Sequence, residues 1–241
     1  MGLNVIMMGP PGAGKGTQAT RFARERGLVR IPTGEVLREA IKDGTPLGRK
    51  VEAGMDRGEL VDDETMIEMV RERLARPDMS AGFLLDGFPR TVPQAEALDQ
   101  IMAARGKGPL VVIDVRVPLQ ELVRRLDGRK VCSSCGANAD PFGPTINRCR
   151  CGGEFVQRAD DNRDVVIERL KVYERQTYPL VEYYQGRPTF RVVNGAPAPA
   201  QVALELDTVI DDAAAVGALV TDRAVVQETS VQETSAQKAG T

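Results

Sequence analysis

The chain has 241 residues, 42% of them hydrophobic, and its formal net charge is -2 at pH 7. This length and composition fit one large domain with a sizeable core, or a core with smaller inserted units. The small net charge gives no electrostatic sign of nucleic-acid binding, and the sequence lacks both a membrane-spanning apolar run and a signal-peptide pattern. We therefore expect a cytoplasmic protein with neither a nucleic-acid nor a membrane partner.

Histidine is absent from the chain and its four cysteines all fall between residues 132 and 151. The absence of histidine excludes imidazole from catalysis and from metal binding. In a reducing cytosol, this clustering of cysteines favours a metal site over disulfides.

Apolar runs and helical patterns alternate along the first half of the chain. The runs at residues 3–8, 83–85 and 110–115 predict buried parallel strands. Helical spacing predicts helices over residues 16–26, 33–43, 47–57, 63–76, 94–104 and 118–127. Pro118 suits the first turn of the last helix.

The pattern breaks between residues 128 and 160, where Cys, Gly, Asn, Pro and Arg dominate and periodicity is weak. We interpret this segment as an inserted small module. Beyond it, the sequence predicts a long helix over residues 162–184, a strand over 189–193 and a helix over 199–215. The final stretch, with its short QETS repeat and few large apolar residues, is predicted to be a disordered tail.

The alternation of strands and helices predicts an α/β fold with a doubly wound parallel sheet of about five strands. Residues 9–17, "GPPGAGKGT", lie between the first strand and the first helix. Glycines let backbone N–H groups approach phosphate oxygens, and the helix N-terminus favours anions. The spacing matches the P-loop of nucleotide-binding proteins, although Gly16 stands where the strict pattern has Ser or Thr. The predicted phosphate cradle comprises Gly12, Ala13, Gly14, Lys15, Gly16 and Thr17.

Two predicted strands end in an acid, at Asp86 and at Asp114. A P-loop enzyme needs a carboxylate at a strand end to hold Mg2+ or its water. We choose Asp86 because glycine and arginine follow it closely. The alternative is an ordinary aspartate in a turn at the strand end.

Six segments together resemble the adenylate kinase family. They are "GPPGAGKGTQ" (9–18), "PTGEVLREAI" (32–41), "GELVDDETM" (58–66), "FLLDGFPRTVPQAEAL" (83–98), "DGRKVC" (127–132) and "FVQRADDNRDVVIERL" (155–170). They occur in the family's order and span most of residues 1–212. The resemblance implies a P-loop NTPase-type fold with helices on both faces of the sheet, and the reaction MgATP + AMP ⇌ 2 ADP.

The resemblance also implies a division of the chain into functional parts. The core would comprise residues 1–32, 62–126 and 161–215, with a helical AMP-binding insert at 33–61, a lid at 127–160 and a tail at 216–241. ATP, AMP and ADP would be the partners of a monomeric enzyme.

By resemblance, the site residues fall into groups that share a ligand. ATP would contact the cradle together with Arg125 and Arg129. AMP would contact Thr33, Arg38, Glu59, Leu60, Val61, Gly87, Arg90, Gln94, Arg158 and Arg169. The catalytic residues would be Lys15, Arg90, Arg125, Arg129, Arg158 and Arg169. Asp86 would organise Mg2+ through water, and Asp160 and Asp161 would pair with lid arginines. Each arginine has the alternative of a solvated surface charge, as for Arg124.

The implied chemistry agrees with the residue types. Phosphoryl transfer passes through a loose transition state, so catalysis needs positioning and positive charge. The attacking phosphate of AMP is ionised near neutral pH, since its second pKa is about 6. No general base is needed, and arginine forks suit phosphate oxygens.

The cysteines form two pairs with different spacing. Cys132 and Cys135 form a C-x2-C half of a zinc site, whereas Cys149 and Cys151 form a C-x-C pair with a smaller bite. Four thiolates would make the zinc structural, because no open position remains. A metal-free lid stays open as an alternative, as does a substitute ligand among Asp140, Asn147 and Asp160.

Two other functions remain as alternatives. A related kinase acting on UMP or CMP is the nearest, although the lid of some 30 residues and "GELVDDETM" favour AMP. The other is a zinc-ribbon interaction module on a nucleotide-binding scaffold, which would bind without turnover. A switch GTPase would need an N-K-x-D segment, and the sequence has none.

Overall fold

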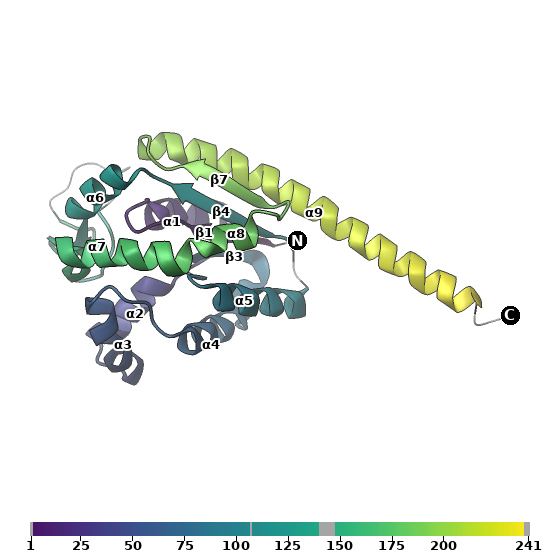
Figure 1. Ribbon diagram of the computed structural model, residues 1–241, viewed down its shortest axis with the longest axis horizontal. Helices are drawn as coiled ribbons and strands as arrows, with labels where there is room; N and C mark the ends of the chain where they lie inside the picture. Colours follow the sequence, from purple (N-terminus) through teal and green to yellow (C-terminus); the bar gives the residue numbers. More distant parts are fainter. Residues whose placement is uncertain (1, 107, 140–147, 239–241) are drawn as a thin grey trace.

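A five-stranded parallel sheet lies at the centre of the molecule and helices cover both of its faces (Figure 1). The structure is a computed structural model that describes residues 2–106, 108–139 and 148–238. The strand order is β2-β3-β1-β4-β7, which confirms the predicted α/β fold with a doubly wound parallel sheet. Its strands are β1 (Leu3–Met8), β2 (Val29–Pro32), β3 (Gly82–Asp86), β4 (Leu110–Arg116) and β7 (Phe190–Asn194).

Edge strand β2 has no counterpart among the predicted elements. It is four residues long, ends in Pro32 and buries only Ile31. Such a short run produces neither a clear apolar stretch nor an alternating pattern. Of the described strands, it pairs only with β3, and so it completes the sheet of about five strands.

Helices occupy the regions where helical spacing predicts them. They are α1 (Lys15–Arg26), α2 (Thr33–Lys42), α3 (Pro46–Asp56), α4 (Asp63–Leu74), α5 (Val92–Arg105), α6 (Leu119–Asp127), α7 (Arg163–Val172), α8 (Pro179–Tyr184) and α9 (Pro199–Lys238). Pro118 is the N-cap residue of α6, one position before the helix begins, and does not lie in the first turn as predicted. The long helix predicted over 162–184 contains a π-helical turn, Tyr173–Thr177, between α7 and α8. Pro179 lacks an N–H group and disturbs the regular hydrogen-bond pattern there.

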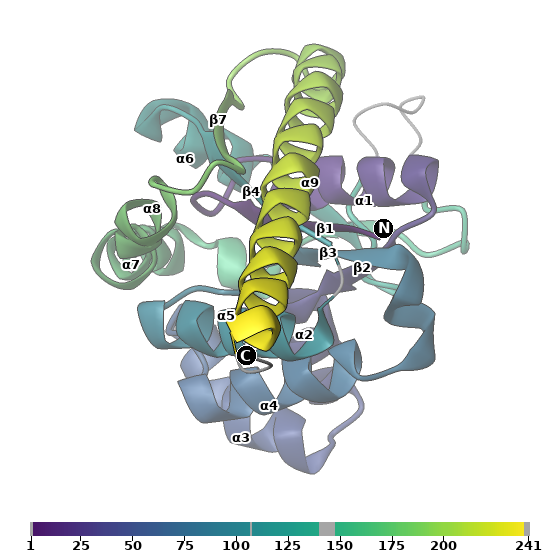
Figure 2. The same cartoon turned by 90° about the vertical axis from the view of Figure 1, so that its right-hand side faces the viewer.

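Alternate residues of the central strand β1 face two separate cores. Ile6 and Met8 pack into a cluster with residues of α2, α3, α4, α5 and α8. Val5 and Met7 pack into a second cluster with residues of α1, α6 and α9. Figure 2 shows α2 to α5 together on one side of the strands. The period-two alternation of a strand therefore explains why apolar helices are needed on both faces.

The segment predicted as an inserted module contains a small sheet of its own. Strands β5 (Lys130–Cys132) and β6 (Phe155–Gln157) pair antiparallel, and within residues 2–106, 108–139 and 148–238 they form no ladder with the main sheet. Their three-residue length explains why no periodicity marks them in the sequence.

Helix α9 continues through residues for which the sequence predicts disorder, from 216 onward, and ends at Lys238. Between Gly217 and Gly240 there is neither glycine nor proline, so nothing in the sequence ends the helix earlier. At Gly217 the helix still contacts the body closely, because an added Cβ would lie 2.4 Å from Cβ of Pro109. Figure 1 shows the C-terminal part of α9 extending beyond the sheet. No helix among the described residues combines the length and apolar character needed to cross a membrane.

Candidate active site

The Gly-rich loop joins the carboxyl end of β1 to the start of α1. Gly9, Gly12 and Gly14 adopt positive φ angles of 136°, 84° and 90°. A Cβ on Gly9 would lie 2.4 Å from the backbone oxygen of Val115, so only glycine fits there. No side chain in the described part of the protein caps α1, which leaves its first N–H groups available to a ligand. The loop therefore has the geometry of an anion cradle.

Two cavities with shared walls open around this loop. The first is lined by residues 12–17, the whole predicted cradle, and also by Asp86, Arg125, Arg129 and Arg158. The second is lined by the residues predicted for AMP: Thr33, Arg38, Glu59, Leu60, Val61, Gly87, Arg90, Gln94 and Arg169. Lys15, Arg38, Arg90 and Arg169 line both cavities. Arg158, predicted to contact AMP, lines only the first. We call these spaces the P-loop cavity and the insert cavity.

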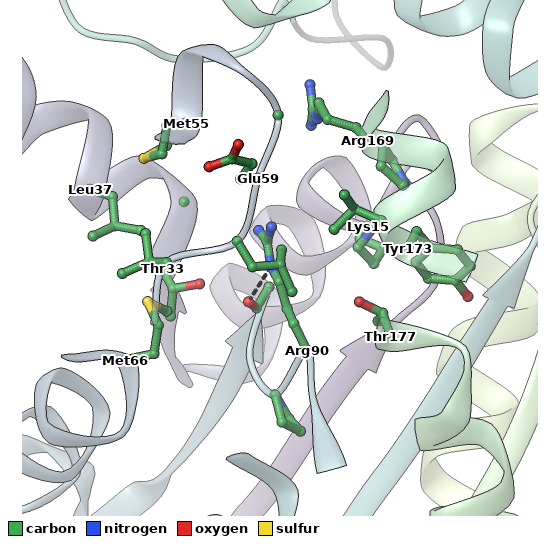
Figure 3. A pocket seen from close by; sticks show the side chains of 18 of the residues that line it. Lys15, Thr33, Leu37, Met55, Glu59, Met66, Arg90, Arg169, Tyr173 and Thr177 are labelled. Carbon is green, nitrogen blue, oxygen red and sulfur yellow. Dashed lines mark hydrogen bonds between the residues drawn. The ribbon is translucent and has the colours of Figure 1, made fainter. Parts of the chain in front are cut away.

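The insert cavity has an apolar side and a cationic side (Figure 3). Leu37, Met55 and Met66 gather on one side, and Lys15 and Arg169 on the other, with Arg90 between them. This arrangement suits a ligand with a flat apolar part and an anionic part. A nucleotide, with its base and phosphate, has this character.

Arg90 is held in place by backbone and side-chain contacts. Its Nε donates to the carbonyl oxygen of Gly87 at 2.8 Å, and Gln94 Oε1 accepts from its backbone N–H at 2.8 Å. Asp63 in turn accepts from Gln94 Nε2 at 2.7 Å and from Thr91 Oγ1 at 2.8 Å. Sequence reasoning missed Asp63, which lies 31 residues from Gln94 and leaves no local pattern. Within the described residues, Arg90 forms no ion pair, so its guanidinium is available to an anion.

Positive charge is concentrated where the two cavities meet. Burial above all, together with Arg90, Arg169 and Arg129, lowers the pKa of Lys15 to about 7 against the opposing effect of Asp86. The Nζ of Lys15 donates to the carbonyl oxygens of Gly9 and Pro10 at 2.7 and 2.8 Å. Burial also lowers the pKa of Arg90. An anion bound at this junction would stabilise the charged form of Lys15.

Two aspartates bind the arginines of this site. Asp161 accepts two hydrogen bonds from Arg129 and one from Arg169, the last at 3.0 Å. Asp160 accepts two from Arg158, at 2.9 and 2.7 Å. Burial alone would raise the pKa of Asp160, but Arg158, Arg169 and Arg38 hold it at about 2. The predicted pairing of these aspartates with arginines is thus present in the structure, with Arg129 and Arg158 as partners.

Arg125 lines the P-loop cavity but uses its donors within the protein. It donates to Glu121 at 2.6 Å and to the carbonyl oxygens of Gly195 and Ala196 at 2.8 and 2.9 Å. Its neighbour Arg124 is exposed and pairs with the same Glu121, as expected for a surface charge.

Asp86 is not alone at the carboxyl end of β3. Arg30 lies between Asp86 and Glu35 and donates to Asp86 Oδ2 at 2.6 Å and Glu35 Oε1 at 2.7 Å. Two carboxylates at the mouth of the P-loop are suitable oxygen donors for Mg2+ or for its water ligands. The other strand-end acid, Asp114, is buried beneath Arg116 and lines neither cavity. Sequence reasoning missed Arg30, because strand β2 was not predicted, and Glu35, which lies in the first turn of helix α2.

The four cysteines converge although the C-x-C pair is short. Cys132 Sγ lies 3.4 Å from Cys151 Sγ, Cys135 Sγ lies 3.6 Å from Cys149 Sγ, and all four lie within 4.8 Å of one another. Ligands at about 2.3 Å from a tetrahedral zinc ion are about 3.8 Å apart, so this donor set fits one metal ion. The C-x-C cysteines thus face different cysteines of the C-x2-C pair.

A close approach of backbone and sulfur brings the two cysteine pairs together. A Cβ on Gly153 would lie 2.5 Å from Cys132 Sγ, so glycine is required there. Of the substitute ligands considered, Asp160 pairs with arginines instead, and Asp140 and Asn147 lie outside the described residues.

Comparison with known proteins gives one consistent result. The family model described as "Adenylate kinase" matches residues 7–189. A curated "Adenylate kinase" of Carboxydothermus hydrogenoformans is 48% identical over 204 residues, covering 83% of this chain and 95% of that protein. Curated adenylate kinases of Lysinibacillus sphaericus and Archaeoglobus fulgidus are 46% and 45% identical, covering 86% and 87% of this chain and 98% of each relative. The chain belongs to the adenylate kinase family.

Proposed function

We propose that the protein transfers the γ-phosphoryl group of MgATP reversibly to AMP, giving two ADP. ATP would lie in the P-loop cavity and AMP in the insert cavity. The observation that carries this proposal is the wall shared by the cavities, formed by Lys15, Arg38, Arg90 and Arg169. A phosphoryl group moving between the two nucleotides would remain in contact with the same cations throughout.

The residues contribute charge and position rather than proton transfer. Backbone N–H groups of residues 12–17 and the start of α1 would hold the ATP phosphates. Arg90, fixed by Gly87 and Gln94, would orient the AMP phosphate by its guanidinium fork. Lys15 and Arg169 would stabilise charge on the transferring group. Because the AMP phosphate is already ionised near neutral pH, no general base is required.

Mg2+ is the metal that adenylate kinases use with ATP, and the donor set at the P-loop suits it. When bound, the ion would neutralise charge on the ATP phosphates. Asp86 and Glu35, which line the P-loop cavity, would hold it through water, and Gly16 lies beside Asp86.

Zinc in the cysteine cluster would be structural. Cys132, Cys135, Cys149 and Cys151 supply four thiolates, which leave no position for a substrate. Burial contributes little to fixing so small a sheet, so a metal ion would hold β5 and β6 in the geometry that carries Arg129 and Arg158.

Residues 127–160 would act as a lid, and residues 33–61 as the AMP-binding insert. Lys42 Nζ in the insert donates to the carbonyl oxygen of Ser134 in the lid at 2.6 Å. Such a contact supports a closed arrangement in which water is excluded from the transferring group. If lid opening limits turnover, single-turnover chemistry is faster than kcat; equal rates would argue against this step. A cytoplasmic location and a monomeric state remain predictions.

An acceptor panel tests the proposed function. Purified protein with MgATP is mixed separately with AMP, CMP, UMP, GMP or no acceptor, and the nucleotides are resolved after a short reaction. Rapid ADP formation only with AMP supports the proposal. Comparable turnover with CMP or UMP would identify the protein as a CMP or UMP kinase. Absence of turnover in folded protein that still binds ATP refutes the enzymatic role and favours a binding module.

A further inference from the structure

Arg30 joins two carboxylates at the mouth of the P-loop. Its Nη2 lies 2.7 Å from Glu35 Oε1 and 2.6 Å from Asp86 Oδ2, and its Nη1 lies 3.1 Å from Glu35 Oε2. Asp86 and Glu35 line the P-loop cavity and are oxygen donors of the kind that suits Mg2+. A permanent cation on the protein thus contacts the same carboxylates as the metal would.

The Arg30–Asp86 pair lies against the first turn of α1. A Cβ on Gly16 would lie 3.4 Å from Arg30 Nη2 and 3.4 Å from Asp86 Oδ2. In the strict P-loop pattern, the residue after the lysine is Ser or Thr, whose hydroxyl ligates Mg2+. In this chain that position is Gly16, and the pair lies alongside it. The guanidinium is therefore close to the region where the metal acts.

Burial strengthens the electrostatic effect of the Arg30 charge on its surroundings. The side chains of Arg30 and Asp86 are only 15% and 11% exposed, so solvent screens them weakly. Within the described residues, the buried Nε of Arg30 has no hydrogen-bond partner, and the two carboxylates alone fix the guanidinium. One positive charge facing two negative charges leaves a single net negative charge for a divalent ion.

We propose that Arg30 is a positioning residue that competes with Mg2+ for Asp86 and Glu35 and so weakens the preference of the ATP site for MgATP over metal-free ATP. This inference rests on the proposed binding of ATP in the P-loop cavity. Arg30 adds positive charge near the phosphates, which favours the free nucleotide, and opposes a second cation beside it. A purely structural ion pair between neighbouring strands β2 and β3 would instead affect both nucleotide forms equally.

The test compares nucleotide affinities without relying on turnover. The dissociation constants of MgATP and of ATP in excess EDTA are measured by calorimetry, and their ratio gives the metal preference. Arg30→Gln removes the charge but keeps a hydrogen-bond donor, and Arg30→Lys keeps the charge. We expect Arg30→Gln to increase the preference for MgATP by at least about tenfold, and Arg30→Lys to change it by less than about threefold.

Arg26→Gln is the matched control. Arg26 also lies in a two-bond pair with an aspartate, Asp211, but lines neither cavity. We expect it to leave both affinities unchanged. An unchanged ratio in Arg30→Gln, or an equal loss of affinity for both nucleotide forms, overturns the proposal.

A second variant keeps the test decisive if Arg30→Gln does not fold. Glu35→Gln leaves Arg30 fully committed to Asp86 and removes one metal donor, so the preference for MgATP should fall. An unchanged or increased ratio contradicts the proposal. If the wild-type protein binds neither MgATP nor metal-free ATP, the proposed function itself is wrong. This outcome differs from an unchanged ratio of the two dissociation constants in Arg30→Gln, which refutes only the role of Arg30.

Discussion

The buried lysine of the P-loop leads to a quantitative prediction about protons. Burial lowers the pKa of Lys15 to about 7 in the free protein. Phosphate oxygens beside it restore the charged form, so ATP binding raises this pKa toward its ordinary value. Because the bound state then holds the proton more tightly, binding is coupled to proton uptake above pH 7.

The magnitude follows from the two pKa values. With a free-state pKa of about 7, roughly one tenth of Lys15 is protonated at pH 8, so binding takes up about 0.9 proton. The affinity for ATP should be highest below pH 7. Above pH 7 it should decrease by up to about tenfold per pH unit, until the pH reaches the pKa of Lys15 in the ATP-bound state. The nucleotide phosphates are already ionised at pH 8 and contribute little.

Calorimetry in buffers of different ionisation enthalpy measures this uptake directly. At pH 8 the observed heat should change with the buffer by an amount equivalent to about 0.9 proton per ATP. Lys15→Arg, which stays charged, is the control and should abolish most of this dependence. A buffer-independent heat for the wild-type protein, with constant affinity between pH 7 and 9, would refute the reasoning.

Three further predictions concern packing, metal and charge. Gly48→Ala should lower the free energy of unfolding, measured in urea, by about 1–3 kcal/mol and should raise KM for AMP. The reason is that the added Cβ would lie 2.0 Å from the backbone oxygen of Ala40 in α2. An unchanged free energy of unfolding and an unchanged KM would contradict the tight contact between α2 and α3. Elemental analysis of the purified protein should find one zinc ion per chain. Chelation of the metal, or Cys135→Ser, should lower the unfolding temperature. A metal-free protein of equal stability would show that zinc has no structural role. Asp161→Asn should lower the free energy of unfolding in urea by about 3–5 kcal/mol, because Arg129 and Arg169 lose their buried carboxylate partner. A decrease in this free energy below about 1 kcal/mol would argue that solvent already compensates the charges of these arginines.

Features encoded in contiguous residues could be predicted from the sequence. The apolar run before "GPPGAGKGT" and the helical pattern after it specify a strand, a loop and a helix, and the structure has all three. The run at 83–85 followed by Asp86 likewise predicts β3 and its carboxylate. The motifs of the AMP side, such as the one around Arg90, identified residues that the structure brings into a single cavity.

Features that depend on contacts between distant segments could not be predicted. Asp63 orients Gln94 across 31 residues, and Arg30 reaches Asp86 across 56 residues, so no spacing reveals either pair. The C-x-C cysteines looked constrained in sequence, whereas the turn closed by the bond from Gly152 N–H to the carbonyl oxygen of Cys149 lets Cys149 and Cys151 face different partners. Strand β2 forms by pairing with β3 rather than by its own apolar pattern.

Direct transfer between two nucleotides across one cationic wall is the central claim, and isotope tracing tests it most directly. The protein is mixed with ATP labelled at the γ-phosphate, Mg2+ and AMP, and the reaction is stopped within the first turnover. The label should appear only in the β-phosphate of the ADP formed from AMP, matched by one unlabelled ADP per transfer. Label retained on the protein, or released as inorganic phosphate at a comparable rate, would contradict direct transfer.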